Sequence, residues 1–198
     1  PAITLPTRTG YTFGGYYTAA IGGTQYYNAD GTSARKWDIA SEKTLYAHWT
    51  ANEYSITYRA NKPAKASSNI IGSTTSSKHT YDNSSALSEN GYSLVGWSFM
   101  GWAETENGTV KYGKNASVIN LATEQGAVVT LYAVWQANEY SVKYEANRPA
   151  GASALVKGSV SDSAHTYDEQ SELSQNGYSL LGWSFKGWAE TAGGAVKY

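Results

Sequence analysis

Residues 90–105 read NGYSLVGWSFMGWAET, and residues 176–191 repeat this stretch almost unchanged as NGYSLLGWSFKGWAET. A shorter relative, TGYTFGGYYT, lies near the start of the chain at residues 9–18. A stretch that recurs at a fixed spacing is typical of tandem repeats, so the chain is interpreted as copies of one structural unit.

The copies are spaced 86 residues apart. Residues 51–112 align with residues 137–198 without a gap, and 40 of those 62 positions are identical. We expect the chain to be a fragment of a longer protein. We divide it into the C-terminal part of a first repeat (1–49), a complete second repeat (50–135) and the N-terminal part of a third repeat (136–198).

The first copy keeps this register only from Gly15 onward. Its earlier Gly10-Tyr11 resembles Gly91-Tyr92, and that match leaves five residues of the second copy, around 95–99, without a counterpart. We interpret those five residues as an expansion that is present only in the second and third copies.

Composition excludes several classes of function. The net charge is −1 and only 16% of the residues are charged, so no basic patch is expected to bind nucleic acid. The chain has no cysteine, which excludes disulfides and cysteine-based zinc sites. No stretch approaches the ~20 apolar residues that span a bilayer, so we expect no membrane insertion of this segment.

Periodicity indicates a β-rich fold. Strict alternation of apolar and polar residues predicts half-buried strands at 54–59 and 140–145, and an apolar run predicts a central strand at 128–135. A strand is predicted over 92–99, in which Gly96 marks either a bulge or a close backbone approach. Short helices are predicted at 118–125 and, in the first copy, at 33–41. The four-residue linkers between repeats favour a nearly fixed angle between units and hence a semi-rigid rod.

The first copy resembles a known family of bacterial repeats. Residues 6–18 read PTRTGYTFGGYYT, residues 22–26 read GGTQY and residues 44–49 read TLYAHW. These stretches closely resemble the Listeria–Bacteroides repeat, also called the internalin B-repeat type. The pattern of that family is P-T-K-T-G-Y-x-F-x-G-W-Y-T, then a turn with Gly before a Tyr, then L-T-L-Y-A-x-W. The resemblance covers essentially the whole chain.

The resemblance implies a fold and a location. The implied fold is mostly β with minor α content, built from tandem small β-grasp-like domains with one short helix per unit. The implied location is the bacterial cell surface or the extracellular medium, often on large adhesins attached to the cell wall. The family carries no established catalytic residues, metal sites or cofactors.

Aromatic residues recur at set places, and two interpretations are open. They could be platforms that stack on sugar rings, or they could pack the core and the contacts between repeats. A small unit without disulfides needs its large rings inside, which favours packing. Trp97 and Trp183, placed in the expansion, are the better candidates for exposed binding platforms. The residues that we assign as structural repeat positions are Gly10, Tyr11, Tyr16, Trp49, Gly91, Tyr92, Trp102, Trp135, Gly177, Tyr178 and Trp188.

Other recurring polar residues give no catalytic or metal site. His79 and Asp82 recur as His165 and Asp168 and could form part of a metal site or a proton relay, but a metal site needs three or four ligands and the unit supplies no others at constant places. Glu104 also recurs, but glycoside hydrolysis requires a second carboxylate across one cleft. We therefore predict no enzyme activity and no cofactor.

Two functions remain open. The first is a non-catalytic stalk or spacer segment of a bacterial surface or secreted adhesin-like protein, whose partners are the neighbouring repeats of the same chain. The second is a multivalent module that binds a glycan or a host surface protein weakly through exposed aromatic residues, with avidity from tandem copies.

Overall fold

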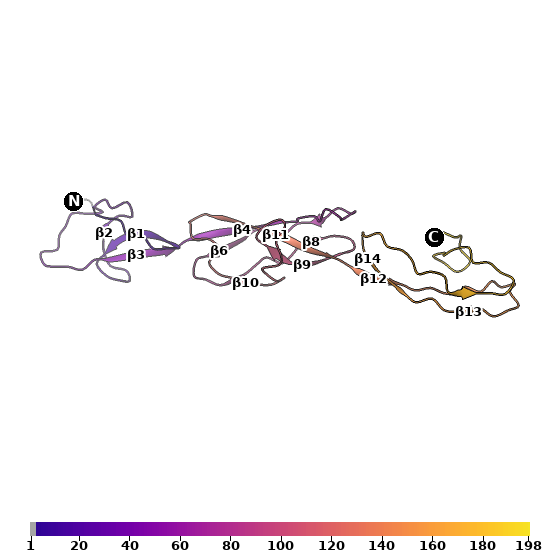
Figure 1. Ribbon diagram of the computed structural model, residues 1–198. Helices are drawn as coiled ribbons and strands as arrows, with labels where there is room; N and C mark the ends of the chain where they lie inside the picture. Colours follow the sequence, from indigo (N-terminus) through magenta and orange to yellow (C-terminus); the bar gives the residue numbers. More distant parts are fainter. Residues whose placement is uncertain (1–2) are drawn as a thin grey trace. The chain divides into compact units, whose positions relative to one another are not determined.

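The computed structural model describes residues 3–198, and β-strands are the regular secondary structure of that range (Figure 1). The strands are β1 (Tyr11–Tyr17), β2 (Gln25–Tyr27), β3 (Tyr46–Ala51), β4 (Glu53–Arg59), β5 (Ile71–Gly72), β6 (Ser77–Thr80), β7 (Ser85–Ala86), β8 (Tyr92–Ser93), β9 (Trp97–Ala103), β10 (Ser117–Val118), β11 (Val128–Ala137), β12 (Glu139–Val142), β13 (Lys157–Gly158), β14 (Ser163–Thr166) and β15 (Tyr178–Ser179).

The described chain separates into two compact units. The first contains the described residues up to Pro63 together with Ser68–Val95 and Phe99–Trp135. The second contains Ala64–Ser67, Gly96–Ser98 and Gln136–Tyr198. Two short segments of the second sequence repeat therefore belong to the compact unit that contains the third.

The predicted helices do not occur within residues 3–198, so the prediction of a β-grasp-like domain with one short helix per unit is wrong. Within 118–125, Val118 lies in β10, which pairs with β7. Asn120 has a φ of 55°, in the left-handed region where helices end. Its Nδ2 donates to the Asp82 carboxylate over 2.8 Å, and its Oδ1 accepts the Asp82 backbone N–H. A helix of two turns is marginal alone, so these contacts and the strand pairing determine the local structure. The prediction that the fold is mostly β is confirmed.

β4 and β11 form the centre of a four-stranded sheet with the order β6-β4-β11-β9 (Figure 1). β4 runs parallel to β11, with Ile56 opposite Val129, and antiparallel to β6. The half-buried strand predicted at 54–59 is confirmed, because Tyr54, Ile56 and Tyr58 are buried and alternate with more exposed residues.

The core of the first unit lies against this sheet. Trp102 is fully buried, and its ring centroid lies 4.7 Å from that of Tyr58 and 4.9 Å from that of Phe99. Leu131 and Ala133 are fully buried in β11, so the central strand predicted there is confirmed. Each buried aromatic ring removes roughly 150–250 Å² from water, so the rings contribute a large share of the hydrophobic stabilisation.

The first copy aligns with the second without any deletion, which contradicts our interpretation of a five-residue expansion. β1 precedes β9 by the repeat spacing along its whole length. In this alignment Gly15 is the counterpart of Gly101, and both have a positive φ, 118° for Gly15 and 149° for Gly101. The counterpart of Trp97 in the first copy is therefore Tyr11 rather than an absent residue.

Residues 92–99 do not form one strand as predicted. β8 ends at Ser93 and β9 begins at Trp97, with a turn at Val95 and Gly96 between them. Gly96 has a φ of 75°, a conformation that suits a turn and that non-glycine residues rarely adopt. This glycine therefore lets the chain change direction between β8 and β9.

The second unit repeats part of the first. β12 follows β4 by the repeat spacing, and it pairs with β14 as β4 pairs with β6. Among residues 3–198, no strand pairs with the other edge of β12, the edge that β11 occupies on β4. Two aromatic residues here are more exposed than their counterparts: Phe185 is 48% exposed and Phe99 is 9% exposed, while Tyr140 is 51% exposed and Tyr54 is 2% exposed.

Candidate functional site

The same set of contacts between sequence repeats occurs once inside each compact unit. We call these sets the first junction and the second junction. The first junction consists of Gly10, Tyr11, Thr12, Asn52, Tyr81 and Asp82, all in the first unit. The second junction consists of their counterparts Gly96, Trp97, Ser98, Asn138, Tyr167 and Asp168, all in the second unit.

Backbone hydrogen bonds define the path of the chain through the first junction. The Asn52 N–H donates to the Gly10 carbonyl over 2.8 Å, and the Tyr81 N–H donates to the Asn52 carbonyl over 2.8 Å. The side chain of Thr12 donates to that of Asn52 over 2.6 Å. Asn52 is buried, so its polar groups require these partners.

The second junction repeats the same bonds. The Asn138 N–H donates to the Gly96 carbonyl over 2.8 Å, and the Tyr167 N–H donates to the Asn138 carbonyl over 2.9 Å. Ser98, the counterpart of Thr12, donates to the Asn138 side chain over 2.6 Å. A network that recurs with the same donors and acceptors indicates that the sequence specifies this geometry.

A tyrosine ring lies against the glycine in both junctions. A Cβ built on Gly10 would lie 2.2 Å from the Tyr81 ring, and one built on Gly96 would lie 2.1 Å from the Tyr167 ring. Both glycines have a φ of 75°. Only glycine combines this φ with so close an approach, so any side chain at these two positions must displace the ring.

A carboxylate completes each junction. Asp82 accepts a hydrogen bond from the Tyr11 hydroxyl over 2.8 Å, and Asp168 accepts one from Trp97 Nε1 over 3.0 Å. Asp168 is also bound by Ser67, whose N–H and hydroxyl both donate to it. Tyr and Trp both present a polar hydrogen at the end of a large ring, so either residue serves in this position.

The stability of the first junction should depend on pH. Hydrogen bonds from Asn120 and then Tyr11 lower the pKa of Asp82. A carboxyl whose folded-state pKa is lowered stabilises the folded form above its unfolded pKa of about 3.9, and that contribution is lost as pH falls through the folded-state pKa. We therefore expect the Tyr81 amide to lose hydrogen-exchange protection below about pH 4. An Asp82→Asn variant should lack this acid transition, and unchanged protection of Tyr81 between pH 6 and pH 3 in the parent chain would contradict the role of the carboxylate.

Trp97 and Trp183, the predicted binding platforms, have different surroundings. Trp97 is partly buried and bound to Asp168 in the second junction. Trp183 is 51% exposed, and no heavy atom lies within 4 Å of a Cβ built on the preceding Gly182. Glycan binding by either residue stays a prediction.

The other residues assigned as structural repeat positions lie in or near packed aromatic clusters. Tyr16 and Trp49 contact Phe13, and Trp135 contacts Phe99 and donates its Nε1 hydrogen to the Ala60 carbonyl. The remaining ones make ring contacts, tyrosine hydroxyl bonds or close glycine approaches: Trp102, Trp188, Tyr92, Tyr178, Gly91 and Gly177. Gly10 and Tyr11 belong to the first junction.

The recurring histidines are part of the packing. His79 is buried, lies stacked on Tyr54, and is hydrogen-bonded to Ser77 and Ser85. Burial lowers the pKa of His79, which favours the neutral ring. His165 has the same kind of environment in the second unit. Over residues 3–198, no three His, Asp or Glu side chains come together in a way that could hold a metal ion.

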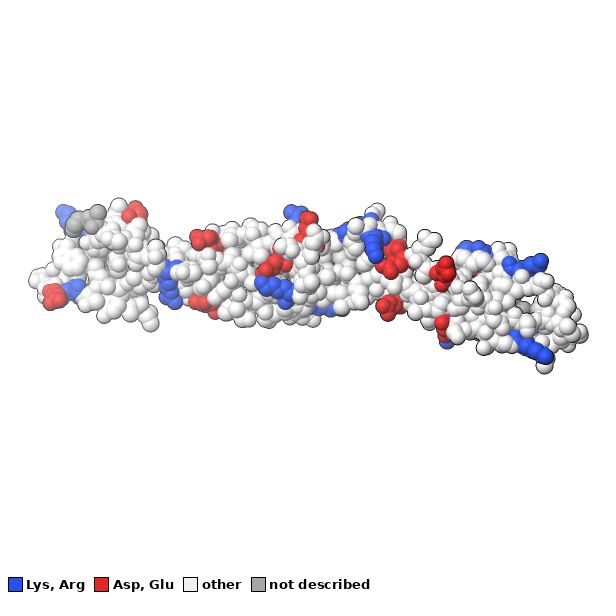
Figure 2. All heavy atoms as spheres, in the orientation of Figure 1, with Lys and Arg blue, Asp and Glu red and all other residues white. Residues whose placement is uncertain are grey.

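Glu104 lies in a local ion pair. Its carboxylate is 2.7 Å from Lys111 Nζ and accepts the Tyr112 hydroxyl over 2.8 Å. The Lys111 ammonium lowers the pKa of Glu104, so this side chain is an anion at neutral pH. On the face shown in Figure 2, acidic and basic residues are scattered without a large patch of one sign.

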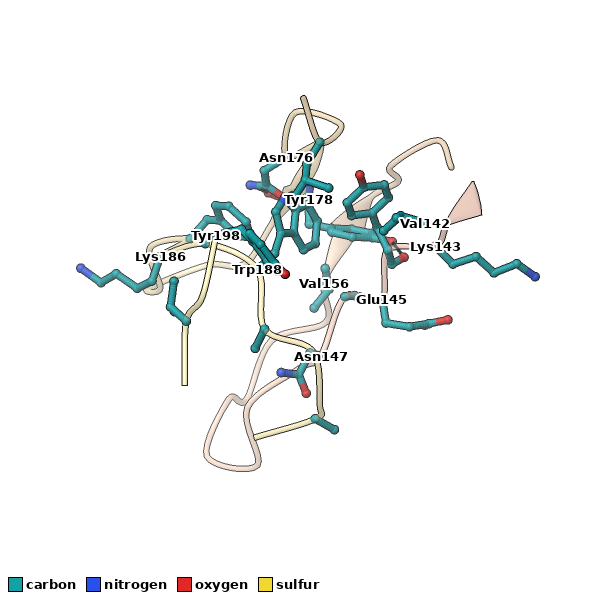
Figure 3. A pocket seen from close by; sticks show the side chains of 18 of the residues that line it. Val142, Lys143, Glu145, Asn147, Val156, Asn176, Tyr178, Lys186, Trp188 and Tyr198 are labelled. Carbon is teal, nitrogen blue, oxygen red and sulfur yellow. Dashed lines mark hydrogen bonds between the residues drawn. The ribbon is translucent and has the colours of Figure 1, made fainter. Parts of the chain in front are cut away.

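A large cavity lies in the second unit, with a volume of about 1830 Å³. In Figure 3 the rings of Tyr178 and Trp188 lie at its centre, while the charged ends of Lys143, Glu145 and Lys186 point away from those rings. The inner wall is therefore aromatic and apolar, and the rim is charged.

The junctions could have been found in the sequence. The pairs Asn52/Asn138, Tyr81/Tyr167 and Asp82/Asp168 recur at the repeat spacing, and so do Gly10/Gly96 and Tyr11/Trp97. The sequence interpretation treated His79 and Asp82 as part of a possible metal site or proton relay, and it matched Gly10-Tyr11 with Gly91-Tyr92 instead of Gly96-Trp97.

Comparison with known proteins identifies one matching family. The model of the Listeria–Bacteroides repeat domain matches residues 1–48 and 54–134, which together are more than half of the chain. No solved structure matches the chain. The described residues contain no helix that could cross a membrane.

Similar proteins come from two bacteria. Internalin H of Listeria monocytogenes is 33% identical over 145 residues, which are 69% of this chain and 21% of that protein. A protein of Evansella cellulosilytica that is named as a membrane protein is 28% identical over 185 residues, which are 90% of this chain and 24% of that protein. The chain thus spans less than a quarter of the length of these relatives.

Proposed function

Because the chain belongs to the Listeria–Bacteroides repeat family, as its motifs predicted, we propose that it is a non-catalytic stalk or spacer segment of a bacterial surface or secreted protein. In this role it holds another part of the protein away from the cell. Its own partners are the neighbouring repeats of the same chain.

The observation that carries this proposal is that the same kinds of contact occur in both junctions. Each combines backbone hydrogen bonds, a tyrosine ring against a glycine, and a carboxylate bound by a ring donor. A flexible linker would need none of these contacts, since Gly/Ser-rich chains behave as random coils. A spacer that must keep a defined length requires stabilising contacts of this kind.

The spacer role can be tested on a bacterial surface. We would place the chain between a membrane or wall anchor and a short peptide tag, and measure how well an antibody reaches the tag on intact cells. The expected result is higher access with the chain than with a Gly/Ser linker of the same number of residues. Equal access with both inserts would overturn the spacer role.

A second candidate function, weak multivalent binding of a glycan or a host surface protein, is supported by one observation. Trp183 is 51% exposed, and Leu181, two residues earlier in the chain, is 86% exposed, as expected of a binding platform. We rank this function second because Trp97, the same position in the second copy, is bound to Asp168. A glycan array probed with the parent chain and with Trp183→Ala decides between them, since a spacer binds no glycan in either form.

A further inference from the structure

The chain contains three Asn-Gly dipeptides, at Asn90-Gly91, Asn107-Gly108 and Asn176-Gly177. An asparagine that precedes a glycine is especially prone to deamidation, because glycine has no Cβ to hinder attack of its backbone nitrogen on the asparagine side chain. All three places have the same dipeptide, so the surrounding structure must determine which of them reacts.

Two of the three asparagines are held by their own main chain. Asn90 Nδ2 donates to the Tyr92 carbonyl over 3.0 Å, and Asn90 Oδ1 accepts the Tyr92 N–H over 3.1 Å. Asn176 makes the same two bonds to Tyr178, over 3.0 Å and 2.9 Å. Both asparagines are partly buried. Because each side chain is bonded to the residue two positions further on, its Cγ is not free to move onto the next backbone nitrogen.

The glycines of these two pairs also lack room for the reaction. A Cβ built on Gly91 would lie 2.0 Å from the Ser73 carbonyl oxygen, and one built on Gly177 would lie 2.2 Å from the Ser159 carbonyl oxygen. The Gly91 N–H also donates to the Thr74 hydroxyl over 2.9 Å. A ring that closes on either glycine nitrogen must therefore displace packed backbone.

Asn107 has neither restraint. It lies exposed in the turn that follows β9, and over residues 3–198 its side chain makes no hydrogen bond. The Gly108 N–H donates to the Thr105 carbonyl over 3.0 Å, which is one bond of a surface turn. The two atoms nearest to a Cβ built on Gly108 belong to side chains, at 2.9 Å and 3.0 Å, and not to packed backbone. The Asn107 side chain is therefore free to reach the Gly108 nitrogen.

We propose that Asn107 is a site of spontaneous modification, because the fold confines deamidation to one of the three Asn-Gly pairs. The Gly108 nitrogen bonds to Asn107 Cγ as the bond between Cγ and Nδ2 breaks. The displaced amide nitrogen leaves as ammonia and takes the proton of the attacking nitrogen. Water then opens the five-membered imide at one of its two carbonyls. The products are aspartate and isoaspartate, and in isoaspartate the main chain runs through the former side chain.

The modification changes the charge of one turn in one copy of the repeat. A new carboxylate at position 107 joins the exposed carboxylates of Glu104 and Glu106. The counterparts of Asn107 at the repeat spacing are Ile21 and Gly193, so the second copy alone has an Asn-Gly pair at this turn. The reaction requires only water, and it proceeds whether or not the repeats act as a spacer.

Incubation of the full chain at mildly alkaline pH tests the proposal. Peptide mapping by mass spectrometry then measures the fraction of each asparagine that has been converted. We expect Asn107 to convert at least about 10-fold faster than Asn90 and Asn176, because those two must first break a pair of hydrogen bonds. Asn107→Gln should remove the fast conversion and leave the slow ones unchanged.

The denatured chain is the matched control. In concentrated guanidinium chloride the bonds to Tyr92 and Tyr178 are absent, so all three Asn-Gly pairs should convert at similar rates. The difference between the folded and the denatured chain then measures the protection that the fold gives to Asn90 and Asn176.

Three results would overturn the assignment. The first is conversion of Asn90 or Asn176 as fast as that of Asn107 in the folded chain, because the bonds to the main chain would then give no protection. The second is conversion of Asn107 as slow as that of Asn90 in the folded chain, because the turn would then restrain Asn107. The third is a preference for Asn107 that persists unchanged in the denatured chain, because the fold would then not be its cause.

Discussion

Replacing Trp102 with alanine should lower the free energy of unfolding of the first unit by about 3–5 kcal/mol, the usual effect of deleting a buried Trp. The Trp102 ring is fully buried and is packed against Tyr58, Phe99 and Tyr92. Domains of this size are typically stable by only about 5–15 kcal/mol, so the loss is a large part of the total. The measurement is denaturant-dependent hydrogen exchange of the β4 and β11 amides, which isolates the first unit from the second.

Two further variants separate the contributions of the Trp102 side chain. Trp102 Nε1 is buried without a hydrogen-bond partner among the described residues, a condition that costs about 1–3 kcal/mol. Trp102→Phe removes that donor and keeps a ring, so it should be much less destabilising than Trp102→Ala. Trp188→Ala changes the same position where the ring lines a cavity, and should destabilise the second unit by less than about 2 kcal/mol. Equal losses for Trp102→Ala and Trp188→Ala would contradict this description of the core.

Replacing Gly96 with valine should open the second junction without unfolding either unit. The new side chain would overlap the Tyr167 ring, and a β-branched residue is strained at a φ of 75°. We expect the Asn138 and Tyr167 amides, which are bonded in the junction, to exchange at least about 10-fold faster. A loss of about 1.4 kcal/mol corresponds to that factor.

The chain contains its own control for this substitution. Gly182 has nearly the same φ, 79°, but nothing lies within 4 Å of its Cβ position. Gly182→Val therefore adds the backbone strain without the clash, and should leave Asn138 and Tyr167 protected. If Gly96→Val and Gly182→Val had the same effect, the contact between ring and glycine would not be what holds the junction.

Much of the sheet could be predicted from the sequence because its strands carry the period-two signal. Residues 54–59 alternate, and residues 128–135 are apolar on both faces, so their positions in the first unit were predicted correctly. The helix at 118–125 was predicted from a short apolar run that ends at a glycine. A run of eight residues fits a helix or an irregular segment equally well, and contacts with distant Asp82 determine the structure.

The junctions were missed for a different reason. Gly91-Tyr92 and Gly96-Trp97 are both Gly-aromatic pairs. Residue identity alone matched Gly10-Tyr11 to Gly91-Tyr92. The structure matches it to the second, through the shared bond to an aspartate. A Trp that donates to a carboxylate and a Trp that stacks on a sugar have the same sequence signature, since both roles use a large ring with a polar hydrogen.

The most direct measurement is the distance distribution between spin labels placed on either side of the second junction. Because the chain has no cysteine, Lys114→Cys and Glu172→Cys introduce the only two thiols, both at exposed positions. If the junction holds successive repeats in a fixed relation, pulsed electron resonance gives one narrow distribution, and adding Gly96→Val broadens it. A broad distribution in the chain without Gly96→Val would contradict a spacer built on these junctions.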